Sequence, residues 1–104
     1  MIEYAPIENH QRLNYTDSVL YCQFLDIDGK RDWRVPRPGD IVDRRYEVNA
    51  MIANGGCTSM HYNAEYWIDI KYSGGSNAVI DGLGEPMFVT RTFEAYIMPV
   101  RDIV

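Results

Sequence analysis

Three aspartates close together form the first pattern in the sequence that could bind a ligand. Asp26, Asp28 and Asp32 surround Gly29, and carboxylates spaced in this way around a glycine are typical of a calcium loop. The twelfth position of an EF-hand loop needs a bidentate glutamate, and this chain has Arg37 there. We therefore interpret the stretch as a turn at the end of a helix with solvated carboxylates, and we expect no metal and no cofactor.

Cys57 and His61 are four residues apart and could act as a nucleophile and its base. They follow the Gly55-Gly56 break, so no helix aligns them, and no acid is placed to orient the imidazole. A half-buried thiol and a loop imidazole are the simpler interpretation, so we assign no catalytic residue and expect no enzyme. The isolated His10 is expected to lie on the surface.

The overall charge excludes several classes of partner. Ten basic and fifteen acidic residues give a net charge of −5, which argues against a general binder of nucleic acid or of anionic membranes. Six of the ten basic residues lie between Lys30 and Arg45, together with three acids. Mixed-sign segments of this kind are usually solvated and internally paired, so this one is not expected to bind anions.

Length and composition indicate one soluble globular domain over residues 1–104. Hydrophobic residues make up 46% of the chain, and no apolar run approaches the length of a membrane span. The N-terminus lacks the basic and apolar regions of a signal peptide. Cys22 and Cys57 have no metal-ligand spacing, which favours folding in a reducing cytosol.

Two helices are expected in the first half of the chain. Residues 16–25 begin with a capping-type Thr16 and stop before Asp28-Gly29, although their apolar side chains point nearly all round a helical wheel, so that a buried strand fits the pattern almost as well. Residues 41–53 follow the break at 36–40 and have one apolar side.

Strands are expected in the second half. Residues 66–72 alternate as a half-buried strand does, and residues 78–80 and 87–90 are shorter strands between glycine-containing loops. The run 95–101 alternates again, with Pro99 at an edge or a bulge. Helices followed by strands predict an α+β domain with a mostly antiparallel sheet.

An ordered series of short motifs spans the chain: Tyr21-Cys22, Gly29, Asp32-Trp33-Arg34-Val35-Pro36, Tyr66-Trp67 and the segment from Tyr96 to Arg101. This series resembles the DUF1566 family, typified by the C-terminal domain of a Legionella collagen-like adhesin, over about residues 13–103. The resemblance implies a C-type-lectin-like fold, with two helices packed on a small twisted antiparallel sheet. It favours a helix over residues 16–25.

The resemblance also implies roles for the motif residues. Trp33 is expected to fill the junction between helices and sheet, Pro36 to end an extended segment, and Arg34 to be held by an acid or by backbone carbonyls. The residues that carry the resemblance are structural: Cys22, Asp32, Trp33, Arg34, Pro36, Trp67, Tyr96 and Arg101.

Departures from the family pattern are informative as well. Many relatives have a cysteine where this chain has Pro99, so Cys22 lacks its usual partner. Glu85-Pro86-Met87 and Trp67-Ile68-Asp69 look like fragments of the sugar-binding motifs of C-type lectins, but in reversed order and without asparagines, and we interpret them as coincidence. No glycine pattern matches a nucleotide-binding loop.

These observations favour a non-enzymatic binding or assembly module, as a bacteriophage virion structural or accessory protein. Its expected location is the virion or the host cytoplasm, and its expected partners are virion subunits, copies of itself or a surface glycan. Two alternatives are an acidic phage protein that inhibits a host complex and a thiol oxidase related to formylglycine-generating enzymes. The candidate contact residues lie in the irregular region between the expected strands: Tyr62, Asn63, Tyr66, Tyr72, Asn77, Phe88 and Arg91.

Overall fold

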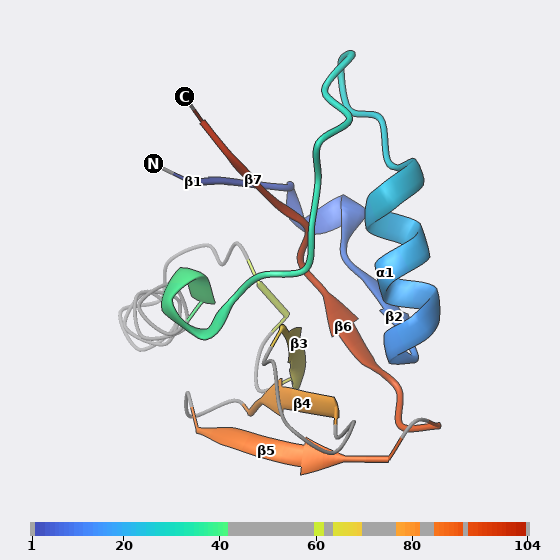
Figure 1. Ribbon diagram of the computed structural model, residues 1–104, viewed down its shortest axis with the longest axis vertical. Coiled ribbons are helices and arrows are strands. Elements are labelled where there is room, and N and C mark those ends of the chain that lie inside the picture. Colours follow the sequence, from blue (N-terminus) through green and yellow to red (C-terminus); the bar gives the residue numbers. More distant parts are fainter. Residues whose placement is uncertain are drawn as a thin grey trace.

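A five-stranded sheet with the helix α1 beside it forms most of the described part of the structure, a computed structural model (Figure 1). It describes residues 2–41, 60–61, 64–69, 77–81, 85–90 and 92–103. The elements in chain order are β1 (Ile2–Tyr4), the 3₁₀ helix η1 (Ile7–Asn9), β2 (Gln11–Leu13), α1 (Tyr15–Phe24), β3 (Tyr66–Ile68), β4 (Asn77–Ile80), β5 (Pro86–Val89), β6 (Ala95–Ile97) and β7 (Val100–Asp102). The α+β class expected from the sequence is confirmed.

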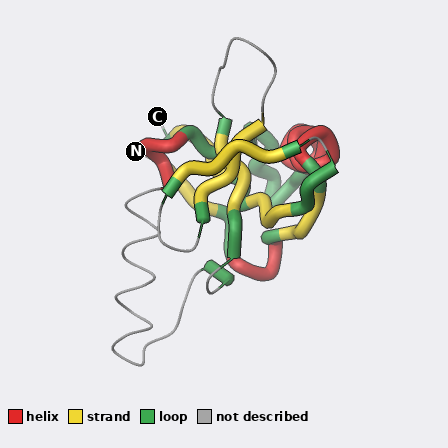
Figure 2. Tube along the Cα trace, turned by 90° about the horizontal axis from the view of Figure 1, so that it is seen from below, coloured by secondary structure: helices red, strands yellow, loops and turns green. Residues whose placement is uncertain are grey.

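The strands form two sheets. The larger has the order β2-β6-β3-β4-β5, and β1 pairs with β7 in a separate two-stranded sheet. All pairs are antiparallel except β3 with β6, which are parallel and meet at Tyr66 and Tyr96. In Figure 2 the helix α1 is seen end-on beside the strands. β6, near the C-terminus, therefore lies inside the larger sheet between β2 and β3, two strands that are far apart in sequence.

The expected helix at 16–25 is confirmed with a shift of one residue. Asn14, not Thr16, is its N-cap, and its side chain accepts a hydrogen bond of 2.8 Å from the backbone N–H of Asp17. A short polar side chain at this position satisfies an amide that the first turn leaves unpaired. The Asp28-Gly29 stop is a separate turn beyond the helix, where both residues have positive φ, 53° and 84°.

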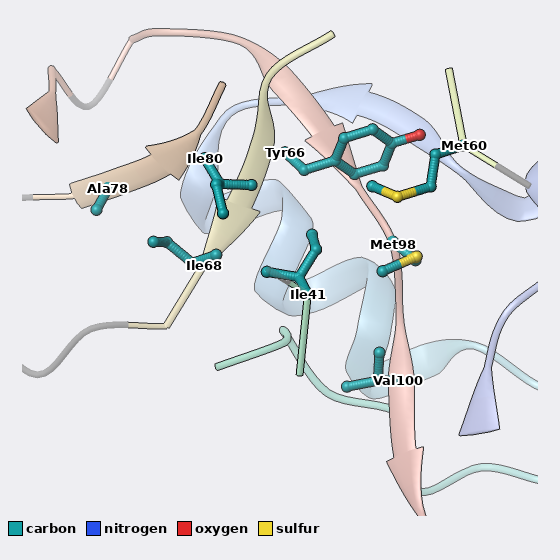
Figure 3. Packing of buried hydrophobic residues seen from close by; sticks show 8 residues of the cluster. All are labelled: Ile41, Met60, Tyr66, Ile68, Ala78, Ile80, Met98 and Val100. Atoms are coloured by element: carbon teal, nitrogen blue, oxygen red, sulfur yellow. The ribbon is translucent and has the colours of Figure 1, made fainter. Parts of the chain in front are cut away.

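Apolar clusters lie on both faces of the larger sheet. One contains Ile41, Met60, Tyr66, Ile68, Ala78, Ile80, Met98 and Val100 (Figure 3). The other, on the side of α1, contains Ala5, Cys22, Trp33, Val35, Trp67, Val79, Ala95 and Ile97. Successive residues of β3 alternate between the two clusters, and all three are buried. The half-buried strand expected at 66–72 is therefore wrong for its first three residues, because β3 is a central strand.

The last expected run divides at Pro99 into β6 and β7. The carbonyl oxygen of Pro99 accepts a hydrogen bond of 2.9 Å from the backbone N–H of Ala5, so the residue lies where the chain leaves one sheet for the other. Expected strands at 78–80 and 87–90 correspond to β4 and β5, whereas β1 and β2 were not expected. Residues 38–41 are helical, and the rest of the helix expected at 41–53 lies outside the described residues.

Candidate binding surfaces

The Asp-Trp-Arg segment holds the C-terminal strand. Arg34 and Val100 exchange two backbone hydrogen bonds of 2.8 and 3.0 Å. The Arg34 guanidinium also lies 2.8 Å from Asp40 and 3.0 Å from Asp102. These two carboxylates, Asp102 above all, raise the pKa of Arg34 above its ordinary value. The expectation that an acid holds Arg34 is confirmed, and the role is structural.

A second ion-pair group connects the N-terminus to the same segment. Arg101 lies 2.7 Å from Glu3 and 2.6 Å from Asp32, and Lys30 lies 2.9 Å from Glu3. Hydrogen bonds from Lys30 and Arg101 lower the pKa of Glu3, and Arg101 lowers the pKa of Asp32. Three of the described basic residues of the 30–45 segment, Lys30, Arg31 and Arg34, are paired, but only the Arg34–Asp40 pair lies inside the segment. The expected internal pairing is therefore wrong for the other pairs, which reach acids elsewhere in the chain.

The other motif residues pack or bind backbone groups. Trp33 is 5% exposed in the cluster beside α1, and its indole N–H donates to the carbonyl of Lys30 over 2.9 Å. The Trp67 indole donates to the carbonyl of Leu13 over 2.7 Å. The Pro36 carbonyl accepts from the backbone N–H of Asp69 over 2.8 Å, which docks the extended segment on the end of β3. These contacts stabilise the fold.

Cys22 is a free thiol. It is 2% exposed on the inner side of α1. Burial in apolar surroundings raises the pKa of the thiol from 9.0 to about 12. Because the thiolate is the nucleophile, this cysteine is chemically inert at neutral pH. Cys57 lies outside the described residues.

The aspartates of the calcium-like pattern bind protein groups instead. Asp26 accepts hydrogen bonds of 2.8 Å from the backbone N–H of Gly29 and from Arg31, while Asp32 faces Arg101. No group of three or more metal-ligating side chains occurs in the part of the chain that the structure describes. The pattern forms a turn, as expected, but this turn lies beyond α1, which ends at Phe24, so the expectation that it ends the helix is wrong.

The expectation that His10 lies on the surface is wrong. His10 is 5% exposed, with Nδ1 2.9 Å from the Tyr66 hydroxyl and Nε2 3.0 Å from the carbonyl oxygen of Ala5. The Tyr66 hydroxyl also accepts from the backbone N–H of His61 over 2.8 Å, and the His61 ring stacks on Tyr96 with centroids 4.1 Å apart. This buried group joins the N-terminal segment to β3 and β6.

The structure divides the candidate contact residues. Tyr66 is completely buried, so its side chain is not available to a partner, which corrects its assignment as a contact residue. Asn77 is half-buried on β4, and Phe88 on the edge strand β5 is 55% exposed. The remaining candidates lie outside the described residues: Tyr62, Asn63, Tyr72 and Arg91.

An exposed apolar surface among the described residues is one that the sequence did not indicate. On the outer side of α1, Phe24 is 83% exposed and Leu20 is 46% exposed. Together with Tyr21, Leu25 and Asp26 they line a hollow of about 310 Å³. We call these five residues the outer α1 surface. Its signal in the sequence is the all-round apolar pattern that made residues 16–25 ambiguous.

Comparisons with known proteins leave the family open. The chain matches no protein-family model, and a comparison with curated proteins finds no match either. Among the described residues, no helix has the length and apolar character that a membrane crossing requires. The class that the fold defines is thus a small α+β domain with a mixed sheet, and the finer assignment to a C-type-lectin-like fold belongs to the proposal below.

Proposed function

We propose that the chain is a non-enzymatic binding or assembly module of the C-type-lectin-like, DUF1566-like class, a phage virion structural or accessory protein. The observation that carries this proposal is the outer α1 surface. A helix that is apolar all round is normally buried all round. α1 buries its inner side against the sheet and leaves Leu20 and Phe24 in solvent. We propose that another virion subunit covers them through an apolar protein surface of its own.

The chemistry of the described residues supports a scaffold. The arginines and acids of the family motif are joined in ion pairs that connect the two termini to the central segment. The oxidase alternative needs a reactive cysteine pair, and burial raises the pKa of Cys22 to about 12. A side chain that is 2% exposed and protonated is suited to packing.

The test is the composition of purified virions of the phage that encodes the chain. Mass spectrometry is expected to find the chain in wild-type particles, and Phe24→Ser is expected to lower its copy number per particle at least several-fold. Because Phe24 is 83% exposed, the substitution should leave the free energy of unfolding within about 0.5 kcal/mol of the wild-type value.

Phe88→Ser is the matched variant, because it makes the same replacement at an exposed side chain on β5. If Phe88→Ser is lost from the particles and Phe24→Ser is incorporated normally, the interface lies on the edge strand β5 and not on the outer α1 surface. Absence of the chain from particles, with recovery of a bacterial complex from host lysate, would favour the inhibitor alternative. Sedimentation of the isolated chain as an oligomer that Phe24→Ser dissociates would identify a second copy as the occupant.

A further inference from the structure

The strand β2 forms an edge of the larger sheet. Among the strands that the structure describes, the order β2-β6-β3-β4-β5 gives β2 a neighbour on one side only (Figure 1). The backbone N–H of Tyr96 in β6 donates to the carbonyl of Glu65 over 2.9 Å, so the polar backbone groups of Tyr96 face β3. Arg12 lies directly opposite Tyr96. The backbone N–H and C=O of Arg12 therefore face away from β6, toward the edge.

These two backbone groups of Arg12 make no hydrogen bond with any part of the chain that the structure describes. Asn14 is still in an extended conformation, so its backbone N–H faces the same edge, and it has no partner among the described residues either. Two donors and one acceptor thus follow one another along β2. Such a row of backbone groups is a template for an added strand.

The helix α1 covers a face of the sheet and not this edge. Ile97, which lies opposite Gln11, belongs to the cluster beside α1. Tyr96 packs against the cluster on the other face, and the side chain of Arg12 points to that same face. Gln11 and Arg12 are both exposed. A partner can therefore reach the edge without displacing α1.

The charge of Arg12 selects the partner. Its guanidinium makes no ion pair with any described residue. By contrast, these basic residues each contact a carboxylate: Lys30, Arg31, Arg34 and Arg101. A second copy that added its own β2 about a two-fold axis centred on Arg12 would place two arginines directly opposite each other. Like charges in that position destabilise strand pairing, whereas an acidic side chain there would pair with the guanidinium.

We propose that β2 binds an extended peptide segment of a partner protein, which adds an antiparallel strand with a glutamate or aspartate opposite Arg12. The residue opposite Arg12 donates its N–H to the Arg12 carbonyl and accepts from the Arg12 N–H. Side chains of such a pair lie on the same face of the sheet, so the carboxylate meets the guanidinium. This edge shares no residue with the outer α1 surface, so either interface can fail alone.

The first measurement is amide hydrogen exchange of the full chain by NMR. The Arg12 amide is expected to exchange quickly, whereas the amides of Gln11 and Leu13, which face β6, are expected to be protected. Protection of Arg12 in the dilute free chain would show that the edge is already covered, and would overturn the inference. Protection that appears only at high concentration would make a second copy the occupant, which also contradicts it.

The second measurement is an amide NMR titration with three capped peptides. They are acetyl-Thr-Val-Glu-Val-Thr-amide, its counterpart with lysine in place of glutamate, and the glutamate peptide methylated on the glutamate nitrogen. The glutamate peptide is expected to shift the amide signals of Arg12 and Asn14 and to bind at least about fivefold more tightly than the lysine peptide. The methylated peptide should lose binding, because it cannot donate to the Arg12 carbonyl.

Arg12→Glu should reverse the preference, so that the lysine peptide binds more tightly. Arg37→Glu is the matched control, because it makes the same charge reversal at an exposed arginine outside β2, and it should keep the wild-type preference. If Arg12→Glu fails to fold, Arg12→Gln replaces it and should bind both peptides equally. Equal binding of the two peptides by the wild type, an unchanged preference in the Arg12 variant, or no shift at the Arg12 amide would overturn the inference.

Discussion

The hydroxyl of Tyr66 bridges two segments, with its oxygen 2.9 Å from Nδ1 of His10 and 2.8 Å from the backbone nitrogen of His61. Nε2 of His10 lies 3.0 Å from the carbonyl oxygen of Ala5, which can only accept. Nε2 of His10 therefore carries a proton and donates to this carbonyl. The Tyr66 hydroxyl accepts from the backbone N–H of His61 and shares a hydrogen bond with Nδ1 of His10, so it ties both segments to β3.

Tyr66→Phe should destabilise the fold by about 1–3 kcal/mol, because it removes the hydrogen bonds that join the buried hydroxyl to His10 and to His61 while keeping the ring. The measurement is the free energy of unfolding from urea denaturation at pH 7. Tyr96→Phe is the control. Tyr96 packs against the same rings, and its hydroxyl makes no hydrogen bond within the described residues. A similar loss in both variants would show that ring packing, not the bridge, carries the effect.

Acid should destabilise the protein through the ion pairs at its termini. Lys30 and Arg101 lower the pKa of Glu3 from 4.5, while Arg101 and Arg34 lower those of Asp32 and Asp102, respectively, from 3.8. A carboxylate whose pKa is lower in the folded state stabilises the fold above its unfolded value, and loses that contribution as the pH falls. Stability should therefore be level near neutrality and should decline below about pH 4.5.

The measurement is the urea midpoint between pH 2 and pH 7, at low and at high salt. Asp32→Asn should make the urea midpoint fall less steeply as the pH is lowered, because it removes one of the two acids that face Arg101. High salt should also make the urea midpoint of the wild type less dependent on pH, since these carboxylates are partly exposed and salt ions screen their charges. A decline of equal size in Asp32→Asn and in the control Glu94→Gln would assign the acid sensitivity to other groups.

Sequence reasoning succeeded where a local pattern determines structure. The strands at β4 and β5 and the interruption at Pro99 follow from short apolar runs and from a residue that cannot donate to a sheet. α1 was ambiguous because its inner positions are small, Ser18 and Cys22, while the larger Leu20 and Phe24 face outward. With small residues on the inner side and large apolar residues on the outer side, the helix lacks the apolar repeat of 3.6 residues that usually identifies a buried face. The same arrangement places the apolar side chains of the outer α1 surface in solvent.

The predictions that were wrong or absent concern residues whose contacts are distant in sequence. His10 looked like a surface residue because Tyr66, which buries it, lies 56 positions later. β1 and β2 have three residues each, too few for a period-two pattern to appear. The open edge of β2 was not predicted either, because the residue that orients Arg12 is Tyr96 in β6. Only the assembled sheet places these two residues opposite each other.

The Cys22 thiol should be unreactive in the folded protein. Its pKa is raised from 9.0 to about 12, so almost no thiolate is present at pH 8. Because the sequence has two cysteines, the Cys57→Ser variant leaves Cys22 as the sole thiol. Titration with a chromogenic disulfide should give almost no signal from this folded variant and one thiol per chain in urea.

The same shift predicts a decline in stability at high pH. The unfolded thiol ionises near 9.0 and the folded thiol near 12, so the contribution of the buried thiol is complete below pH 9 and is lost as the pH rises toward 12. The Cys57→Ser, Cys22→Ala double variant should lack this part of the decline. Rapid labelling of folded Cys22 at pH 8 would contradict the assignment and would revive the oxidase alternative.

Gly29 and Gly39 should respond in opposite directions to alanine. A Cβ at either position would meet no atom within 4 Å, so any effect comes from the backbone alone. Gly29 has φ 84°, and an alanine there costs about 1–2 kcal/mol. Gly39 lies among the helical residues 38–41, where alanine is favoured over glycine by up to about 1 kcal/mol. Urea denaturation of the two variants checks the pair. Destabilisation by both substitutions would show that Gly39 is not held in a helical conformation. Stabilisation by both would show that Gly29 is not held in the left-handed conformation of the turn between α1 and the Asp-Trp-Arg segment.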